Sequence, residues 1–381
     1  MAQDKDLKTP NVPPLRFPGF TDKWKESTIG NVVKIGNGRD YKHLGNGSIP
    51  VFGTGGYMTS VDDYLYDGET VFIGRKGSID KPFYFSGKFW TVDTLFYTYD
   101  FNGVIPKFLY SIFQRINWKK YNEASGVPSL SKATIEKIKF KYPLSPEQDK
   151  ISRLLSLIDE RIATQNKIID NLQSLIKGLN DKFHEEVQGE LVSFSEIGIA
   201  YSGLSGKSGD DFGQGYPFIT YLNVYQNNVI NEDDFGLVTI AANESQHTIS
   251  YGDVLFTLSS ETPDEVGIGS VYLGESDKFY LNSFCFGVSI PNKDRIYPPY
   301  LAHLVSSTKF RKFVYPLAQG STRFNLQKND FMKKKFILPT IEKQRRIATT
   351  LDAINAQLAN EKRLKDLYIA KKEYLLRQIF I

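Results

Sequence analysis

The sequence contains one cysteine and four histidines among its 381 residues. The single cysteine, Cys285, cannot form an internal disulfide, so we expect a cytoplasmic protein. Cys285 stands between two phenylalanines, and this apolar setting predicts a small buried side chain rather than a nucleophile. The histidines lack the short spacing of metal ligands, which argues against a structural zinc site. They are His43, His184, His247 and His303.

Membrane and secretion signals are also missing. No run of about eighteen apolar residues occurs, so the sequence predicts no membrane-spanning helix, and the charged first residues lead us to expect no signal peptide. The net charge of +4 is small, which permits nucleic-acid binding without requiring it. Apolar side chains are abundant, at 41 % of the 381 residues. This length and composition predict more than one domain with a substantial core.

A repeat with a period of 196 residues organises the sequence. Residues 130–143 match residues 326–339, and the correspondence continues without a gap into the residues that follow. A repeat this long is not a solenoid unit, so it indicates a duplicated half. The matching positions beyond Pro143 and Pro339 include Gln148 with Gln344, Ile151 with Ile347, Leu155 with Leu351, and Ile158 with Ile354.

Each copy continues with apolar residues that alternate steps of four and three. This spacing is typical of a coiled-coil seam, and about forty helical residues would extend about 60 Å. In the first copy the seam comprises Ile151, Leu155, Ile158, Ile162, Ile169, Leu172, Ile176 and Leu179. In the second copy it comprises Ile347, Leu351, Ile354, Leu358, Leu375 and Ile379, with Glu361, Lys365 and Lys372 interrupting it.

A seam requires a partner helix, and each copy is the nearest candidate for the other. If the two helices are antiparallel with matched ends, Gln165 falls near Lys365 and Ile169 falls near Glu361. Such a polar layer fixes the register of a coiled coil at a cost in stability. A second interpretation remains open, in which these residues lie on the solvent side of a kinked helix.

The remainder of each half has the pattern of a globular α+β domain. Short β-rich runs with glycine turns precede an amphipathic helix expected over residues 107–121, and the second half follows the same plan loosely. We therefore predict an α+β fold with two similar globular domains, two long helices forming an antiparallel coiled coil, and a pseudo-twofold internal repeat. The predicted segments are an extended arm (1–20), a first domain (21–142), a first helix (143–187), a second domain (188–338) and a second helix (339–381).

Three motifs resemble catalytic or cofactor sites, and each lacks a required element. The run from Gly203 to Ser208 resembles the end of a phosphate-binding loop, but Tyr201 stands where that loop needs its first glycine. Tyr297-Pro-Pro-Tyr300 resembles a motif of amino-methyltransferases, but tyrosine cannot replace the hydrogen-bond acceptor, and no glycine-rich cofactor loop accompanies it. Asp264 is not followed by the acidic-x-lysine element of a nuclease. We therefore predict no catalytic residue, no metal and no cofactor in this chain.

A surface suited to nucleic acid is the feature that recurs. Gly74-Arg75-Lys76-Gly77-Ser78 follows a strand, and its glycines would turn the backbone tightly and push two cations forward. The corresponding loop of the second half, residues 257–262, carries hydroxyls. This difference fits two domains that read different bases, and drift of hairpin tips explains it equally well. The basic residues before each helix are either phosphate contacts or a solvated face.

The candidate DNA-binding residues are drawn from these loops and from the segments around them. They are Arg39, Lys42, Thr54, Arg75, Lys76, Ser78 and Lys132 in the first half, and Tyr221, Asn223, Ser259, Ser260, Arg323, Asn325 and Lys328 in the second.

Three sequence features together resemble a known family. They are the opening run from Leu15 to Trp24, the Gly-Ser-Thr-(x)3-Leu-(x)9-Phe-(x)2-Pro pattern that ends at Pro339, and the Pro-(x)4-Gln-(x)2-Ile pattern at Pro143 and Pro339. Over essentially its whole length the chain resembles the specificity subunit of type I restriction-modification systems. The first copy departs from the family pattern, because Ser125-Gly-Val-Pro-Ser129 replaces the usual Gly-Ser/Thr start.

The resemblance implies a non-catalytic subunit with two target-recognition domains, each reading one half of a split double-stranded DNA sequence. It implies that two adenine methyltransferase subunits dock around the helices, and that a translocating nuclease subunit completes the restriction form. S-adenosylmethionine would be bound by the partner and not by this chain. Two other classes remain open, a self-contained DNA methyltransferase and a coiled-coil adaptor that never meets DNA.

Overall fold

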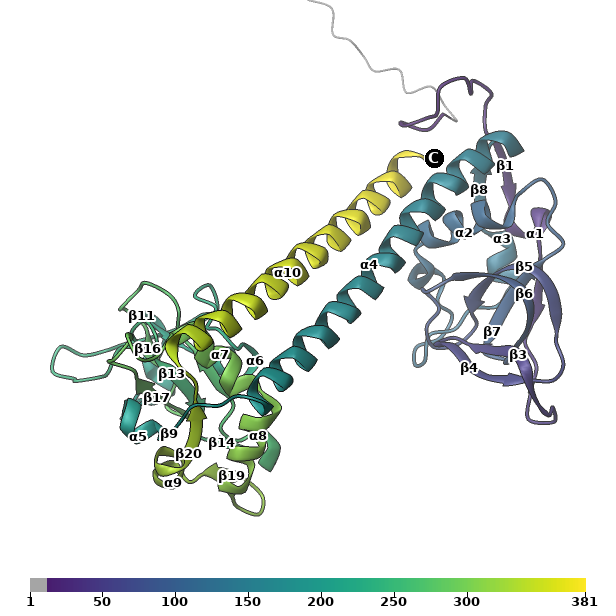
Figure 1. The fold of residues 1–381 in the computed structure, drawn as a ribbon. Coiled ribbons are helices and arrows are strands. Elements are labelled where there is room, and N and C mark those ends of the chain that lie inside the picture. Colours follow the sequence, from purple (N-terminus) through teal and green to yellow (C-terminus); the bar gives the residue numbers. More distant parts are fainter. Residues whose placement is uncertain (1–11) are drawn as a thin grey trace, which may run out of the picture. The chain divides into compact units, whose positions relative to one another are not determined.

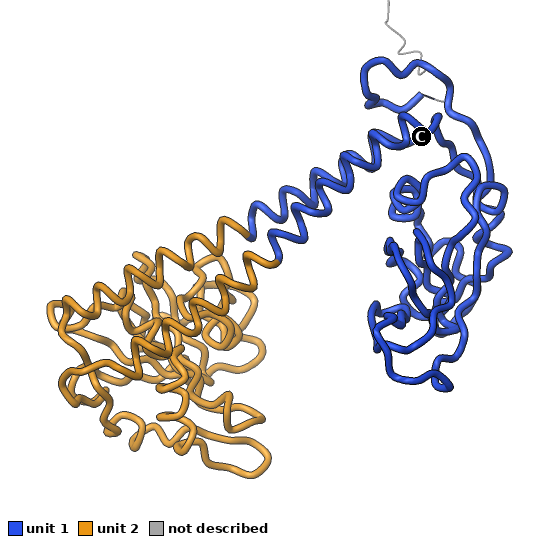
Figure 2. The backbone as a smooth tube through the Cα atoms, turned by 45° about the vertical axis from the view of Figure 1, so that its right-hand side comes forward, with its two compact units in different colours: residues 1–166, 362–381 blue, residues 167–361 orange. Residues whose placement is uncertain are grey.

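The computed structural model describes residues 12–381 (Figure 1). Residues 1–11, the first part of the expected arm, lie outside this range. The chain divides into two compact units, coloured separately in Figure 2: unit 1 comprises Met1–Asn166 with Lys362–Ile381, and unit 2 comprises Lys167–Glu361. Each unit therefore contains one globular part together with a portion of both long helices.

Unit 1 is built around a six-stranded sheet with the strand order β2-β7-β5-β6-β3-β4. All neighbouring strands are antiparallel except β3 and β6, which are parallel. The sheet strands are β2 (Lys34–Asn37), β3 (Asn46–Gly53), β4 (Gly56–Val61), β5 (Tyr66–Gly74), β6 (Phe83–Thr91) and β7 (Leu95–Tyr99). The other elements are β1 (Lys25–Thr28), α1 (Ile29–Val32), α2 (Pro106–Arg115), η1 (Trp118–Tyr121), α3 (Lys132–Lys137) and β8 (Lys139–Tyr142).

The central strand β5 is buried on both faces of the sheet. Successive side chains of a strand point to opposite faces, so Val71 and Ile73 pack in one cluster with helix α2 while Phe72 packs in a second, aromatic cluster. Val71, Phe72 and Ile73 are each 0 % exposed. This burial fixes the register of β5 and hence the position of the loop that follows it.

The helix expected over residues 107–121 is shorter in the structure. Helix α2 ends at Arg115, and after a turn the chain forms the short 3-10 helix η1. The indole N–H of Trp118 donates to the carbonyl of Phe113 (2.8 Å), which satisfies a carbonyl at the helix end that a longer helix would have paired. The amphipathic pattern continued past the end of the helix because Trp118 is buried in the same core.

Unit 2 distributes its strands over several small sheets, of which the largest has the order β10-β17-β13-β15. Its strands are β9 (Glu190–Ser193), β10 (Ile199–Ser202), β11 (Phe212–Ile219), β12 (Phe235–Val238), β13 (Val254–Thr257), β14 (Ser259–Ser260), β15 (Gly269–Val271), β16 (Tyr280–Leu281), β17 (Cys285–Ser289), β18 (Ala318–Gln319), β19 (Phe324–Leu326) and β20 (Lys335–Leu338). Its short helices are α5 (Phe194–Ile197), η2 (Gly209–Asp211), α6 (Tyr221–Gln226), η3 (Pro263–Glu265), α7 (Pro298–Ser306), α8 (Thr308–Val314), η4 (Tyr315–Leu317) and α9 (Lys328–Lys333).

The central strand of unit 2, β13, repeats the arrangement of β5. Val254 and Phe256 pack in one cluster with helix α7, and Leu255 packs in the other. Cys285 is buried in the second cluster, which confirms its prediction as a small core side chain. Both units therefore bury their central strand on two faces.

The two long helices are α4 (Ser145–Glu185) and α10 (Ile341–Gln378). In unit 1 the first turns of α4 pack on the last turns of α10, with Ile151 and Leu155 in one cluster with Leu375 and Ile379. In unit 2 the pattern is reversed, because Leu179, near the end of α4, packs against the cluster that holds residues from the start of α10. These contacts define an antiparallel pair, and the predicted fold class is confirmed.

All of the predicted seam positions are buried or half-buried on both helices. This includes the polar positions, since Gln165 is 5 % exposed and Lys365 and Glu361 are half-buried. Lys372 forms an ion pair with Asp159 within unit 1. The solvent-side interpretation of Gln165 is therefore wrong, because α4 continues unbroken through this position with the glutamine turned inward.

A buried glutamine fastens the start of each long helix. The Gln148 side chain accepts from the N–H of Ile105 (2.9 Å) and donates to the carbonyls of Gly103 (2.8 Å) and Pro143 (2.9 Å). Gln344 makes the same three types of bond to Tyr297, Arg295 and Pro339. Both glutamines are 0 % exposed. The Pro-(x)4-Gln spacing thus joins each long helix to the N-terminus of α2 or α7.

Candidate nucleic-acid interface

The cationic loop of unit 1, residues 74–78, is held between two other segments. The N–H groups of Arg75 and Lys76 both donate to the carbonyl of Thr94 (2.8 and 3.2 Å), and the carbonyl of Arg75 accepts from the N–H of Leu130 (2.9 Å). Gly77 has a φ of +85°, a conformation that residues with a side chain disfavour. The backbone of this loop is therefore fixed, with Arg75 half-buried and Lys76 exposed.

Two further predicted residues, Arg39 and Thr54, lie in neighbouring parts of unit 1. The N–H of Arg39 donates to the carbonyl of Thr91 (2.8 Å), and the indole N–H of Trp90 donates to the carbonyl of Arg39 (2.9 Å). A Cβ added at Gly77 would lie 3.7 Å from Oγ1 of Thr54. The structure thus places Thr54 beside the cationic loop, whereas Arg39 is held at the end of β6, three residues before the Thr94 carbonyl that fastens this loop.

The remaining predicted residues of unit 1 are less closely joined to this group. Ser78 ends the cationic loop and is half-buried. Lys42 is exposed in the loop between β2 and β3. Lys132 is exposed at the first turn of α3 and forms an ion pair with Glu136 (3.7 Å). Neither lysine forms a hydrogen bond or ion pair with the cationic loop within residues 12–381.

Unit 2 repeats the backbone arrangement of the cationic loop. The N–H of Leu258 donates to the carbonyl of Phe284 (2.8 Å), and the carbonyl of Leu258 accepts from the N–H of Leu326 (2.8 Å). Ser259 pairs with Asn325 in the same way that Lys76 pairs with Ser129 in unit 1. The loop after the central strand is thus fastened to the segment before α3 or α9 in both units, while its side chains differ.

Four predicted residues of unit 2 line one pocket of about 820 Å³, which we call the tyrosine pocket. The rings of Tyr221 and Tyr225 are stacked with centroids 6.1 Å apart, and the hydroxyl of Tyr221 donates to the carbonyl of Ser259 (2.9 Å). The lining residues are Tyr221, Leu222, Tyr225, Ser259, Ser260, Glu261, Glu265, Phe284, Thr322 and Arg323.

Hydroxyl groups hold two charged side chains of this pocket, Glu265 and Arg323, in place. The Glu265 carboxylate accepts from the hydroxyls of Tyr225 (2.6 Å) and Ser260 (2.8 Å), and these bonds lower the pKa of Glu265 below its usual value. Nε of Arg323 donates to Oγ of Ser259 (3.3 Å). Glu265 therefore stays ionised at neutral pH, within the same pocket as the arginine.

Sequence reasoning missed Glu261, Glu265, Tyr225 and Phe284. The apolar run Phe284-Cys-Phe286 predicts buried side chains throughout, but Phe284 is 53 % exposed while Cys285 is buried. The two-residue alternation of a strand would have separated them. Glu261 lies in the loop 257–262 and Tyr225 on the same helix as Tyr221, but no motif distinguishes them, and only the fold brings them into one pocket with Glu265 of η3.

Asn223 requires a correction. It is 0 % exposed, and its amide nitrogen donates to the carbonyls of Asn231 (2.8 Å) and Asp234 (2.5 Å). Its amide oxygen accepts from the N–H of Asn231 (3.1 Å). The prediction that Asn223 contacts DNA is therefore wrong, since these bonds use the side chain to shape the loop after α6.

Three other predicted residues differ in how much they present to solvent. Ser259 is buried and acts on the pocket through Arg323, whereas Asn325 is exposed. The Lys328 ammonium lies 5.0 Å from the centre of the Phe286 ring, and burial lowers the pKa of this lysine. The Lys328 ammonium is thus already engaged with a core aromatic ring and is only half-exposed to a ligand.

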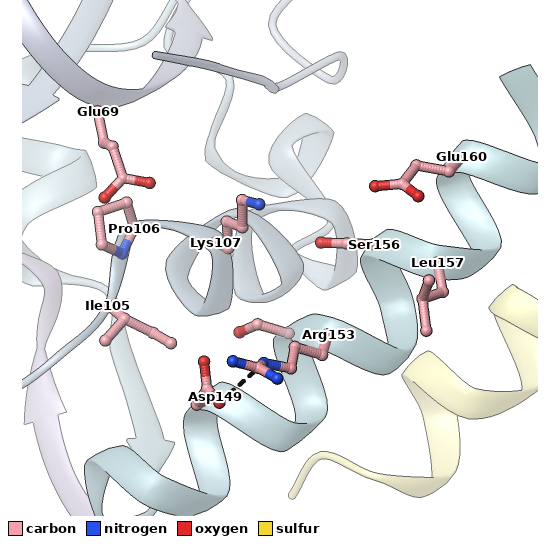
Figure 3. A pocket seen from close by; sticks show the side chains of 10 residues that line it. Glu69, Ile105, Pro106, Lys107, Asp149, Arg153, Ser156, Leu157 and Glu160 are labelled. Atoms are coloured by element: carbon pink, nitrogen blue, oxygen red, sulfur yellow. Dashed lines mark ion pairs between the residues drawn. The ribbon is translucent and has the colours of Figure 1, made fainter.

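Unit 1 has a different pocket, of about 650 Å³, between the start of α2 and the first half of α4 (Figure 3). Asp149 and Arg153 form an ion pair on its α4 wall (3.1 Å), and Glu69 and Lys107 lie across from them. None of the predicted DNA-binding residues lines it. Its carboxylates outnumber its cations, which disfavours contact with a phosphate backbone.

The structure offers no arrangement that supports the three rejected motifs. Lys207 pairs with Glu244, which leaves it engaged within a polar turn. Tyr300 is fully buried on helix α7, and Tyr297 precedes that helix as its N-cap. Within residues 12–381 no cluster of histidine, cysteine, aspartate or glutamate side chains could hold a metal ion, and none of the helices there has the length and apolar content needed to cross a bilayer.

A family model described as the type I restriction modification DNA specificity domain matches residues 21–174 and 195–367. The chain belongs to this family. The two matched ranges cover both globular parts and most of both long helices, in agreement with the internal repeat.

Two curated relatives agree with this assignment. A putative type I restriction enzyme specificity subunit of Haemophilus influenzae is 22 % identical over 329 residues, which cover 81 % of this chain and 80 % of the relative. The type I restriction enzyme MjaVIII specificity subunit of Methanocaldococcus jannaschii is 25 % identical over 326 residues, which cover 79 % and 74 %.

Solved structures support the fold. The S subunit of a type I restriction-modification system from M. genitalium aligns with a TM-score of 0.63 at 14 % identity, covering 97 % of this chain and 99 % of that chain. A chain from a study of complex assembly in the type I restriction-modification system aligns with a TM-score of 0.56 at 15 % identity, covering 93 % and 96 %.

Proposed function

We propose that this family member is the DNA-recognition and scaffold subunit of a type I restriction-modification complex. Each globular part reads one half of a bipartite target in double-stranded DNA, and the paired helices set the length of the unread spacer. The chain itself carries no catalytic residue and no cofactor. Its single buried cysteine fits a cytoplasmic location.

The observation that carries this proposal is the repeated loop arrangement. In both units a loop after the central strand is fastened by backbone hydrogen bonds to the segment before a short helix. The backbone is shared, but cations stand in one loop and hydroxyls in the other. A fixed scaffold with different side chains at matched positions is what two half-sites of different sequence require.

The proposed partners are two methyltransferase subunits, with restriction and translocation subunits in the full complex. Both long helices expose large apolar side chains. These side chains support docking there, because a bound partner would remove their apolar surface from water. These side chains are Leu157, Leu175, Leu364 and Leu367. S-adenosylmethionine and the pocket for the flipped adenine belong to the methyltransferase partner in this proposal.

The test uses the full chain, co-expressed with its methyltransferase subunits in a host that lacks adenine methylation. We expect methylated adenines in a motif of two constant half-sequences separated by a constant gap. Seven helical residues are then inserted after Leu172 and seven before Leu358, positions that flank facing stretches of the two helices in unit 2. Because each insert adds about 10 Å, the gap should lengthen by about three base pairs.

The half-sequences should remain unchanged in this insertion variant. Altered half-sequences with an unchanged gap would contradict the assignment of spacing to the helices. A purified chain that binds S-adenosylmethionine by itself would favour a self-contained methyltransferase instead. An assembled complex that protects no DNA from cleavage would favour the adaptor.

A further inference from the structure

The guanidinium of Arg323 is oriented before any ligand binds. Its central carbon lies 5.3 Å from the centre of the Phe284 ring, and its Nε donates to Oγ of Ser259 (3.3 Å). The two terminal nitrogens form no hydrogen bond or ion pair with any residue in the range 12–381. The guanidinium is thus held through its Nε and its face, while its two terminal nitrogens remain available. This orientation reduces the conformational entropy lost when the guanidinium binds a planar partner.

The charges around Arg323 make phosphate a poor partner for it. Glu261 and Glu265 line the same pocket, and Glu265 is kept ionised by its hydroxyl donors. Two carboxylates beside one guanidinium give the pocket a net negative charge, and a DNA phosphate would be repelled. The Arg323 fork is therefore better suited to the uncharged edge of a base.

A guanine–cytosine pair has the complementary pattern. In the major groove guanine offers two acceptors, O6 and N7, which match an arginine fork, and cytosine offers an amino donor that matches a carboxylate. Of the two glutamates, Glu265 already accepts from two hydroxyls. Glu261 is exposed and forms no hydrogen bond or ion pair within the described part of the chain, so its oxygens are available.

We propose that the tyrosine pocket of unit 2 reads one G·C base pair, with Arg323 on the guanine and Glu261 on the cytosine amino group. Ser259 and Phe284 are positioning residues that hold the arginine. The proposal rests on the proposed function, because it names the base pair that unit 2 reads within its half-site.

Unit 1 does not carry the same reader. The 196-residue repeat aligns Arg323 with the exposed Val127, and the shared backbone bond aligns Phe284 with Thr94. The arginine and the aromatic ring that supports it are therefore both absent at the matched positions. Unit 1 instead places Arg75 on the other strand of the loop pair, so the two units should prefer different base pairs.

The experiment compares the wild-type complex of the full chain and its methyltransferase subunits with three variants, Arg323→Ala, Arg323→Lys and Glu261→Gln. Each complex is incubated with a library of DNA duplexes randomised over the half-site that unit 2 reads, and bound sequences are counted. Arg345→Ala is the matched control, because Arg345 also lies over an aromatic ring, that of Tyr297 (4.7 Å), but lines no part of the tyrosine pocket. Methylated-adenine mapping in cells repeats the readout.

For the wild type we expect one position of the second half-site to be constant as G·C. Arg323→Ala should reduce the preference for G·C at that position by about tenfold to a hundredfold, while every other position keeps its preference. Arg323→Lys should restore affinity for DNA without restoring the preference, because an ammonium lacks the fork. Glu261→Gln should weaken discrimination at the same position, and Arg345→Ala should leave the preferences unchanged.

Two results would overturn the proposal and leave the proposed function intact. One is a bipartite wild-type motif without a constant G·C pair in the second half-site. The other is an equal loss of affinity on all sequences for Arg323→Ala, which identifies a phosphate contact. If the wild type shows no bipartite preference at all, the proposed function itself fails. Melting temperatures of the variants, with Arg323→Lys as the folded comparison, separate these outcomes from misfolding.

Discussion

The buried glutamine at the start of each long helix gives the sharpest stability prediction. Gln148→Ala removes the three side-chain hydrogen bonds to Ile105, Gly103 and Pro143. The N–H of Ile105 and the two carbonyls remain in a site where Gln148 is 0 % exposed. The neighbouring pocket is lined by Ile105 but not by Gln148, Gly103 or Pro143, so we expect water there to replace at most part of the lost bonding.

The size of the effect follows from these three bonds. A buried intramolecular hydrogen bond contributes about 1 kcal/mol, and a donor left unpaired in the interior costs about 1–3 kcal/mol. We therefore expect Gln148→Ala to reduce the free energy of unfolding by about 3–5 kcal/mol. A loss of this size would lower the melting temperature of a unit of about 200 residues by about 6–20 °C.

The positions of the tryptophans make the assay specific to one unit. The sequence has three tryptophans, Trp24, Trp90 and Trp118, and all of them lie in unit 1. Urea unfolding followed by tryptophan fluorescence therefore reports on unit 1, whereas circular dichroism at 222 nm reports on both units. Gln148→Ala should shift the fluorescence transition strongly. The equivalent variant Gln344→Ala should shift the circular-dichroism transition more than the fluorescence transition.

Gln173→Ala is the control, because it removes the same side chain from an exposed position of the same helix. Because Gln173 lies in unit 2, its effect is measured by circular dichroism, and it should change the free energy of unfolding by less than about 0.5 kcal/mol. A loss below about 1 kcal/mol for Gln148→Ala, or an equal loss for Gln173→Ala, would refute the reasoning. The Pro-(x)4-Gln pattern would then have a role other than holding the junction.

Three further predictions concern the helices and a buried histidine. Replacing Gln165 and Lys365 together with leucine should raise the melting temperature but produce several species on native gels, and one unchanged species would contradict a role in register. Lys372→Met leaves the carboxylate of Asp159 without its half-buried partner, and should cost about 1 kcal/mol in urea unfolding. Burial lowers the pKa of His184 to about 4, so the unfolded state binds the proton first as the pH falls. Stability should therefore drop by about 2 kcal/mol between pH 7.5 and pH 5, and His184→Phe should flatten this dependence.

The repeat and the seam could be predicted because they depend on spacing alone. A four-three alternation of apolar residues gives a narrow helical stripe whatever the rest of the chain does. The same spacing identified Gln165 as a seam position, although a polar residue there also allowed a solvent-side interpretation. Only its burial, at 5 % exposure, distinguishes the two. The sequence does not reveal the function of Gln148, because two of its three partners, Ile105 and Gly103, lie more than forty residues earlier.

The candidate interface was predictable only in part, because it depends on contacts between distant loops. The charge of Arg323 is visible in the sequence. The pocket around it is not, because Glu265 and Phe284 reach it from other segments. An asparagine amide can read adenine, yet the amide of Asn223 is used within its own loop. Residue type indicates what a side chain can bind. Its hydrogen bonds to the protein decide whether it is free to do so.

The two units show how one chain can keep a geometry constant and change what it reads. The bonds of Gln148 and Gln344, and the backbone bonds of the loops after β5 and β13, use groups that are the same in both halves. Substitutions at other positions therefore leave these bonds in place. The residues at the ends of those loops make none of these bonds, and there Arg323 and Phe284 of unit 2 correspond to Val127 and Thr94 of unit 1. Because buried bonds fix the backbone, exchanging the exposed residues 127 and 323 should change base preference at little cost in stability. A large loss of stability from that exchange would mean that the surface and the scaffold are not independent.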